Sequence, residues 1–336
     1  MQFPEVLYLG PGAGVGPGPD DFVLALMSGG ASALLCAPAA GISLKDKQQV
    51  HRALLMSGAP IGQMNVLRKH LSRVKGGQLA AAAHPARVLG LLISDVPGDD
   101  PSEIGSGASV GDISTSADAA AIAKRFDIAL PASAHVALLA PSGVVSPDDP
   151  RLSKCENRVI AAPAQSLAAA KELAATFGYD VRILGDAIEG EARDEARRQA
   201  AIALEVAAGL QASADPVLLL SGGECTVTGA GSGIGGPNAE FALAAALALD
   251  AHPDIHLIAC DTDGIDGAAE VAGALVAPDT LARARQAGVD PADALARNDA
   301  HSFFAAINDQ VVTGPTLTNV NDFRAILIAP KARALS

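Results

Sequence analysis

A segment rich in basic residues, Asn65–Gly77, gives the first sign of chemistry in this acidic chain. It reads NVLRKHLSRVKGG and holds four of the 24 lysines and arginines of a protein whose net charge is −13. On a helix predicted over 62–74, Arg68, Ser72 and Lys75 fall at positions i, i+4 and i+7 and share one face. Such a face can clamp a phosphate or a carboxylate, whereas the plainer interpretation is a solvated basic helix.

Two Ser-Gly-Gly turns, each directly after an apolar run, are candidate anion cradles. Glycines leave backbone N–H groups uncovered, and several such groups together can hold a phosphate or a carboxylate. The alternative is a tight strand-to-helix turn that binds nothing. The candidate residues are Ser28, Gly29 and Gly30, with Ser32 just beyond them, and Ser221, Gly222 and Gly223, with Glu224 directly after them.

Acidic loops follow two other apolar runs, DVPGDD at 95–100 and DTDGID at 261–266. Carboxylates in such loops can hold Mg²⁺ together with phosphate oxygens or accept a proton from a hydroxyl group. We expect Asp263, together with Asp266, to bind Mg²⁺ or to orient an attacking hydroxyl. A cluster of helix N-caps and turns is the alternative interpretation.

The glycines of Gly231–Gly236 satisfy the pattern G-x-G-x-x-G, and a helix is predicted from Pro237. A strand, these glycines, a helix and a later acid are the order of a nicotinamide-dinucleotide fold, so NAD(P)H is the alternative cofactor. The pattern is weak, because Glu224–Thr228 separates the strand from the glycines. The sequence contains no P-loop, no zinc-protease motif and no Gly-x-Ser-x-Gly elbow.

Short apolar runs alternate with alanine-rich stretches along the chain, which predicts an α/β fold. Runs that are apolar throughout suit parallel strands covered on both faces, so we expect two Rossmann-like parallel-sheet domains. Ligands of such sheets lie at the carboxyl ends of strands, which predicts an active site in the cleft between the domains. A linker-like segment, PSGVVSPDDP, predicts domains at 1–150 and 151–336. Strands are expected at 22–27, 87–93, 216–220, 255–259 and 324–328, and helices at 45–57, 62–74, 116–125, 165–177, 190–209, 237–249, 279–287 and 300–308.

Composition excludes several classes of protein. Hydrophobic residues make up 49% of the 336 residues, which is too apolar for a disordered chain. No apolar run reaches the roughly 18 residues of a membrane helix, and the net negative charge argues against binding to nucleic acid. Four isolated cysteines and the lack of a signal peptide predict reduced thiols and a cytoplasmic protein.

Five separated motifs, taken in order, resemble the type II glycerate 2-kinase family, which is also catalogued as the tartrate-operon hydroxypyruvate reductase group. The resemblance runs from about Asp21 to Ile328, and the part at about 215–328 is similar to the MOFRL domain of that family. The motifs are SGGASALL at 28–35, NVLRKHLSRVKGGQLA at 65–80, SDVPGDDPSEIGSG at 94–107, LLLSGGECTV at 218–227, and DTDGIDG at 261–267 followed by GPTLTNVND at 314–322.

The resemblance implies an ATP-dependent phosphotransferase that uses Mg²⁺ to phosphorylate the 2-hydroxyl of D-glycerate. It implies catalytic roles for Asp263, Arg68 and Lys75, while the two Ser-Gly-Gly turns hold anionic groups. Three asparagines in the family motifs are expected to bind substrate or phosphate: Asn238, Asn319 and Asn321. A homodimer and a role in tartrate degradation are further expectations.

The sequence departs from the family pattern at a few positions. Proline stands at 237, where the pattern has a functional arginine, and Ala31 and Asp261 replace glycines. An N-terminal segment of the pattern, which carries an active-site lysine, has no counterpart in residues 1–20, so the first domain is expected to be truncated at its start. Two alternatives therefore stay open: a reductase that converts hydroxypyruvate with NAD(P)H, and an inactive family member that binds small hydroxy acids.

Overall fold

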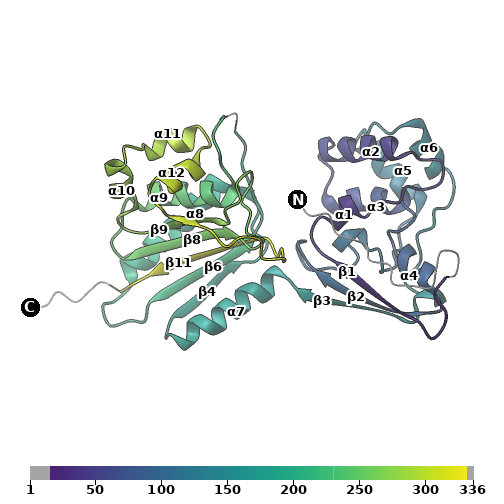
Figure 1. Ribbon diagram of the computed structural model, residues 1–336, viewed down its shortest axis with the longest axis horizontal. Helices are drawn as coiled ribbons and strands as arrows, with labels where there is room; N and C mark the ends of the chain where they lie inside the picture. Colours follow the sequence, from purple (N-terminus) through teal and green to yellow (C-terminus); the bar gives the residue numbers. More distant parts are fainter. Residues whose placement is uncertain (1–15, 230, 331–336) are drawn as a thin grey trace, which may run out of the picture. The chain divides into compact units, whose positions relative to one another are not determined.

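The computed structural model describes residues 16–229 and 231–330. The chain divides into two compact units, unit 1 (Met1–Ile160) and unit 2 (Ala161–Ser336), which Figure 1 colours along the sequence. The division falls ten residues beyond the expected boundary near 150. The reason is strand β3 (Cys155–Ala161), which follows the linker-like segment and still belongs to the sheet of unit 1.

Unit 1 is built on a three-stranded sheet of order β1-β2-β3. Strands β1 (Phe22–Met27) and β2 (Arg87–Ile93) pair in parallel, as their unbroken apolar sequences predict. The helical elements of the unit are α1 (Ala31–Leu34), α2 (Leu44–Met56), α3 (Ile61–His70), α4 (Gln78–Ala83), α5 (Ser116–Arg125), α6 (Ala132–Leu138) and two short 3₁₀ turns, η1 (Ile104–Ser106) and η2 (Pro150–Leu152).

Helices α2, α3, α5 and α6 surround a core of their own in unit 1. Val50 and Leu54 of α2 pack in one buried cluster with Leu67 of α3. Helix α2 starts with a capping box, in which Ser43 accepts from the backbone N–H of Asp46 and the Asp46 side chain accepts from the backbone N–H of Ser43. This start fixes the helix whose charged residues matter below.

Unit 2 contains a six-stranded sheet of order β10-β9-β8-β11-β6-β4. Strands β4 (Asp180–Gly185) and β6 (Val217–Gly223) pair in parallel, whereas β11 (Asp322–Ile328) lies antiparallel between β6 and β8 (Ile255–Asp261). The remaining elements are β5 (Gly190–Glu191), β7 (Cys225–Thr226), β9 (Gly273–Val276), β10 (Gln310–Val311), α7 (Pro163–Thr176), α8 (Ala192–Gly209), α9 (Pro237–Leu249), α10 (Thr280–Gln286), α11 (Pro291–Ala296) and α12 (Ala300–Ala306).

The predicted α/β class with parallel strands is confirmed, but the sheet of unit 2 is mixed: only β4 and β6 pair in parallel, and its other four pairings are antiparallel. Helices α8 and α9 pack against each other on one face of this sheet, and α7 covers the other (Figure 1). Alanines spaced along α8, such as Ala196, Ala200 and Ala203, are fully buried and let α9 approach closely.

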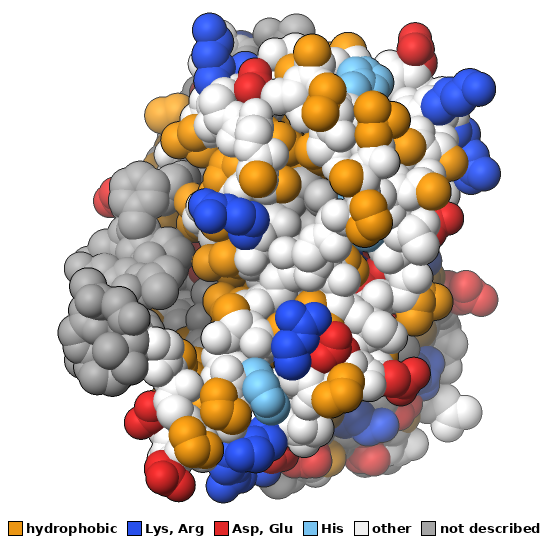
Figure 2. Space-filling model, turned by 90° about the vertical axis from the view of Figure 1, so that its right-hand side faces the viewer, with side chains coloured by type: hydrophobic (Ala, Val, Ile, Leu, Met, Phe, Trp, Pro, Cys, Tyr) orange, Lys and Arg blue, Asp and Glu red, His pale blue; other side chains and the backbone are white. Residues whose placement is uncertain are grey.

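Hydrophobic side chains also reach the surface. Figure 2 shows the side on which Figure 1 draws unit 1, and apolar side chains gather in the upper half of that view, with charged ones mainly below and at the rim. Val136 of α6 and Leu139 just after it are exposed by 66% and 87%. Within the described part of the chain, no helix is both long and apolar enough to span a bilayer.

Candidate functional site

A cavity of about 300 Å³ in unit 1 brings together residues that the sequence singled out. Arg68, Ser72 and Lys75 all line it, and so does Ser32 from the first Ser-Gly-Gly segment. The walls come from the segment around α1, from α2, and from α3 with the chain that follows it. The sequence analysis missed the contribution of α2, which adds Lys47 and other basic side chains to the lining.

The helix predicted over 62–74 is too long, because α3 ends at His70. Ser72 and Lys75 therefore do not continue a helical stripe from Arg68. They reach the same cavity because the chain turns back after α3, and the Lys75 Nζ atom donates to the carbonyl of Gly105 over 3.2 Å. The three residues were grouped correctly, although the local structure that groups them is a turn and not a helix face.

Positive charge converges on this cavity without a carboxylate. Arg68 and Lys75 are only 7% and 1% exposed, and no Asp or Glu is found among the described residues of the lining. Burial, with Lys47 and Arg68 nearby, lowers the pKa of Lys75 to about 7. Burial likewise lowers the pKa of Lys47 to about 8. Buried cations of this kind need a counter-charge, so the cavity is suited to an anionic ligand.

Arg68 is held in place by a buried amide. Its Nη1 atom donates to Oδ1 of Asn65 over 3.0 Å, and Ser106 donates to the same oxygen over 3.2 Å. The Asn65 amide nitrogen in turn donates to Glu103. The Nε atom of Arg68 is buried and has no hydrogen-bond partner among the described residues.

The other basic residues of the segment have different partners. Lys69 is buried and pairs with Asp112 at 2.5 Å and with Glu103 at 3.1 Å. His70 lies between two hydroxyls, those of Ser142 at 2.6 Å and Ser114 at 3.0 Å. These side chains hold the segment in place, so Arg68 and Lys75 are its two cations that face the cavity.

The first Ser-Gly-Gly turn already holds an internal carboxylate. The backbone N–H of Gly30 donates to Asp95, whose pKa burial raises. Ser28 and Gly29 belong to the same turn but do not line the cavity. Ser32 does, and its hydroxyl lies 3.0 Å from that of Ser106. The predicted cradle thus reaches the anion site only through Ser32.

The second Ser-Gly-Gly segment is not a turn, because Ser221, Gly222 and Gly223 are the last residues of strand β6 and pair with β11. These residues serve packing. The Ser221 hydroxyl is buried and donates to Gln199 over 2.9 Å, while the Gly222 carbonyl accepts from the backbone of Ile188 over 3.0 Å. A Cβ atom on Gly223 would lie 2.2 Å from the Ile188 nitrogen, so only glycine permits this approach. Glu224, directly after β6, is exposed.

Asp266 caps helix α9 in this structure. Its Oδ1 accepts from the backbone N–H of Asn238 over 2.9 Å and its Oδ2 from that of Ala239 over 2.8 Å. His301 lies 3.0 Å from Oδ2, and the carboxylate is only 1% exposed. Both oxygens are therefore engaged with the protein, and this arrangement lends no support to the predicted magnesium role of Asp266.

A second group of polar residues gathers where β8 ends and β11 begins. Asp261 and Asp322 are opposite one another on these strands, and Asp263 lies 3.4 Å from the amide of Asn319. Burial raises the pKa of Asp261 to about 7, with Asp263 and Asp322 adding repulsion. Asn238 donates to Asp322 over 2.6 Å. The structure therefore brings four predicted residues to one edge of this sheet: Asp263, Asn238, Asn319 and Asn321.

Asp263 is the carboxylate of this group best placed for a nucleotide-bound magnesium ion. Its Oδ1 accepts from the backbone of Ile265 over 2.7 Å, its Oδ2 has a long contact of 3.4 Å with Asn319, and its side chain also shares a hydrogen bond with Asp261. No set of three His, Cys, Asp or Glu side chains within residues 16–229 and 231–330 is arranged to hold a metal by itself. Mg²⁺ bound to phosphates needs only one or two protein carboxylates, and these residues fit that mode.

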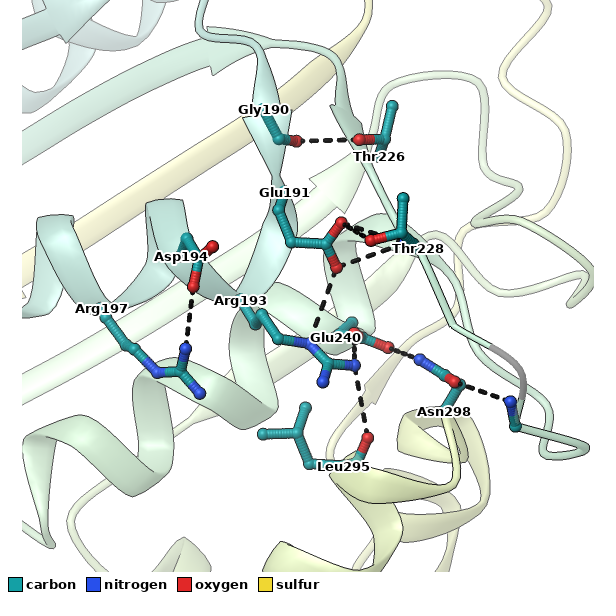
Figure 3. A network of polar contacts seen from close by, with 11 residues as sticks. Gly190, Glu191, Arg193, Asp194, Arg197, Thr226, Thr228, Glu240, Leu295 and Asn298 are labelled. Atoms are coloured by element: carbon teal, nitrogen blue, oxygen red, sulfur yellow. Dashed lines mark hydrogen bonds and ion pairs between the residues drawn. The ribbon is translucent and has the colours of Figure 1, made fainter.

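The glycine loop at 231–236 has close backbone contacts with the protein, although Gly231, Ser232 and Ile234 are exposed. Figure 3 shows the polar network beside it. Arg193 donates to Glu240 over 2.9 Å, and Asn298 bridges Glu240 at 2.9 Å and the backbone of Gly231 at 3.2 Å. A Cβ atom on Gly231 would lie 2.1 Å from the carbonyl oxygen of Arg297. Close packing explains this glycine, and Asp266 already occupies the helix N–H groups that a pyrophosphate would need.

These features define a class of protein: two α/β units, one with a cationic cavity and one with an acidic strand edge. Residues 15–139 match the domain of unknown function DUF4147, and residues 217–322 match the MOFRL family. A protein of Agrobacterium vitis named as a hydroxypyruvate reductase is 54% identical over 93% of this chain and 71% of its own length.

Two solved structures are also similar. The glycerate kinase of Thermotoga maritima has a TM-score of 0.83 and 38% identity over 93% of this chain and 74% of that chain. A protein of Pyrococcus horikoshii has a TM-score of 0.76 and 35% identity, covering 93% of this chain and 72% of that one. The chain belongs to the type II glycerate 2-kinase family with a MOFRL domain.

Proposed function

We propose that this protein is a D-glycerate 2-kinase, which transfers the terminal phosphoryl group of ATP to the 2-hydroxyl of D-glycerate. The observation that carries the proposal is the cavity of unit 1, where the buried cations Arg68 and Lys75 face a space without a carboxylate. Membership of a family in which the Thermotoga maritima relative is named a D-glycerate 2-kinase supports the same activity.

In this proposal the cavity binds an anionic group of the substrates, either the glycerate carboxylate or a phosphate. The guanidinium of Arg68 offers its unpartnered Nε–H, and Asn65 fixes its orientation. Lys75 adds a second positive charge, and a bound anion will favour the protonated form of this lysine. Phosphoryl transfer is accelerated mainly by positioning and charge neutralisation, which are the two things that these residues provide.

Asp263 is proposed to act at the acidic edge of unit 2. It would hold the Mg²⁺ of the nucleotide or accept a hydrogen bond from the attacking hydroxyl, and Asn319 would keep its carboxylate oriented. Mg²⁺, when bound, neutralises phosphate charge. That Arg68 and Asp263 serve one active site in a cleft stays a prediction, as do the homodimer, the cytoplasmic location and the role in tartrate degradation.

The second candidate is the reductase activity that names the Agrobacterium vitis relatives. It would need a dinucleotide at the glycine loop before α9. The carboxylate of Asp266 accepts from the first N–H groups of that helix, and Gly231 packs against Arg297. The described structure therefore offers this candidate less support than it offers the kinase.

A paired assay on the purified chain tests the proposal. D-glycerate with Mg·ATP is followed for ADP, and hydroxypyruvate with NADH or NADPH is followed for loss of the reduced cofactor. We expect ADP release that requires glycerate, with L-glycerate as the stereochemical control. Asp263→Asn should reduce the rate about 100-fold or more. The matched control is Asp293→Asn, at an exposed residue of α11, which should keep the rate. Hydride transfer without ADP release would overturn the proposal.

A further inference from the structure

A cysteine lies in the wall of the cationic cavity. Cys36 follows α1, lines the cavity with Lys47, Arg68 and Lys75, and is exposed. The exposure of Cys36 matters, because a thiol buried in a core is inert, whereas a solvent-exposed thiol beside cations is reactive.

The cavity provides independent evidence for an anionic ligand next to this thiol. Arg68 is more than nine-tenths buried, lines the same cavity, and carries an Nε–H that finds no acceptor among the described residues. Lys75 is buried in the same wall. An anion that enters to meet these cations comes close to Cys36.

The other cysteines are poorly placed for reaction. Burial raises the pKa of Cys225 and of Cys260 to about 11, so neither forms a thiolate readily near neutral pH. Burial also raises the pKa of Cys155. Among the cysteines of the described residues, only Cys36 is exposed. The other three cysteines therefore serve as internal references in a reactivity experiment.

We propose that Cys36 is a thiolation site for small anionic disulfides, which the cations of the cavity attract to it. The Cys36 proton goes to solvent, and the thiolate attacks one sulfur of the disulfide. A new S–S bond forms to Cys36 as the old S–S bond breaks, and the other half leaves as a thiolate with the electron pair. The disulfide is the oxidant and no further co-reactant is needed.

Thiolation at this position places an anionic group among the cations of the cavity. That group competes with any anionic substrate for Arg68 and Lys75, so the modification should inhibit the protein. This regulatory consequence rests on the proposed function, whereas the reactivity of the thiol does not. Reduction by a dithiol releases the bound half and should restore the free cavity.

The test compares three small disulfides of similar size on the full chain: dithiodiglycolate, which is anionic, 2-hydroxyethyl disulfide, which is neutral, and cystamine, which is cationic. Mass spectrometry of digested protein measures the rate at each cysteine. We expect dithiodiglycolate to modify Cys36 at least about tenfold faster than the neutral reagent, with cystamine slowest, because charged clefts raise local ion concentration. Cys36→Ser should remove the fast phase. Equal rates, or the reverse order, would overturn the proposal.

Two charge variants locate the cause of the preference. Arg52→Gln removes an exposed cation of the cavity wall, and Lys45→Gln removes an exposed cation from the same helix that does not line the cavity. We expect the first to reduce the anion preference about two- to threefold and the second to leave it unchanged. Equal effects of both variants would show a preference set by net charge and contradict the assigned role of the cavity.

An activity-independent readout separates this inference from the proposed function. Inorganic phosphate at millimolar concentration should slow the labelling of Cys36 by the neutral reagent, because it occupies the cations beside the thiol. If labelling is fast and phosphate-sensitive but the protein has no glycerate kinase activity, the thiolation site is supported and the proposed function is wrong. If the protein has kinase activity but the three disulfides label Cys36 at equal rates, the thiolation proposal is wrong and the proposed function stands.

Discussion

The two units handle buried charge in opposite ways. In unit 1 the cations Arg68 and Lys75 line a cavity whose described walls contain no carboxylate. In unit 2 the glycine-rich turns and the helix N-terminus are already satisfied from within, since Asp266 caps α9 and also lies beside His301. Both units carry sequences that look like anion cradles, but in unit 1 the groups left for a ligand are cations in a cavity wall, whereas in unit 2 the group left is the carboxylate of Asp263.

This difference shows that a glycine-rich turn is not by itself evidence of a binding site. The turn at Gly30 donates to Asp95, and Gly223 is required by the approach of Ile188. A donor that meets an internal acceptor stabilises the fold and offers nothing to substrate. A buried cation in a cavity wall without a carboxylate, such as Arg68, is a better sign of a ligand, because its burial without a counter-charge is unfavourable.

Replacing Asp266 would give the largest effect on stability. Asp266→Asn turns one acceptor oxygen into a donor that faces backbone N–H groups, so we expect a loss of about 3 kcal/mol in the free energy of unfolding. Urea unfolding followed by circular dichroism measures it. Asp263→Asn, three residues away, should change stability by less than about 1 kcal/mol. Similar losses for both would break the distinction between a capping and a functional aspartate.

Arg68→Gln tests the opposite case, a charge that the fold leaves for substrate. It keeps a donor near Asn65 but removes the guanidinium from the cavity, so kcat/KM for glycerate should fall about 100-fold. Initial rates of ADP formation measure the change. Arg73→Gln, an exposed neighbour, should stay within about twofold of the parent. A fall shared by both variants would mean that the segment matters only for folding.

Asp261 should make unit 2 sensitive to pH. Its folded pKa of about 7 exceeds the unfolded value of 3.8, so the folded protein holds the proton more tightly. This favourable contribution is fully present below pH 3.8 and is lost as the pH rises through 7. Asp261→Asn stays neutral, and we expect it to gain about 1–2 kcal/mol over the parent between pH 5 and 9.

Urea midpoints across that pH range measure the gain. Asp215→Asn, in the exposed loop before β6, is the matched substitution and should show a flat difference. A gain that shrinks with rising pH would contradict the assignment.

Anion binding in unit 1 should weaken as the pH rises, because the lysines of its cavity lose their positive charge. Lys75 loses its proton near pH 7 in the free protein, and Lys47 near pH 8. We expect the affinity for glycerate to fall about fivefold between pH 6 and 9, as measured by titration calorimetry. Lys75→Met should bind more weakly at pH 6 and show a flatter profile. An affinity that rises with pH would rule out the lysine as a ligand.

The sequence predicted much of the fold because its local signals agree with its packing. The strands at 22–27 and 87–93 and the helices at 116–125 and 237–249 form as expected. Several elements were missed, among them strands β3, β4 and β9 and helices α4, α6 and α11. β4 carries Asp and Arg among its apolar residues, and α6 has only seven residues, so neither shows a clear period.

The candidate site was predicted less evenly. Arg68 and Lys75 were found from their charge in an acidic chain, and the cavity gathers them even though the helix ends early. Lys47 was missed, because an isolated lysine on α2 looks like a solvated side chain. Its Nζ atom donates to the carbonyl of Leu71 over 3.2 Å. No residue pattern near Lys47 in the sequence predicts that contact.

The sequence by itself determined the α/β class, the order of most elements and the basic segment, since these depend on neighbours within a few residues. Its motifs also determined the family. Only the tertiary structure decided which charges remain for a ligand. Gly30 meets Asp95 and Asn238 meets Asp266 across long stretches of chain, and whether a buried donor finds its acceptor inside the protein depends on such distant partners.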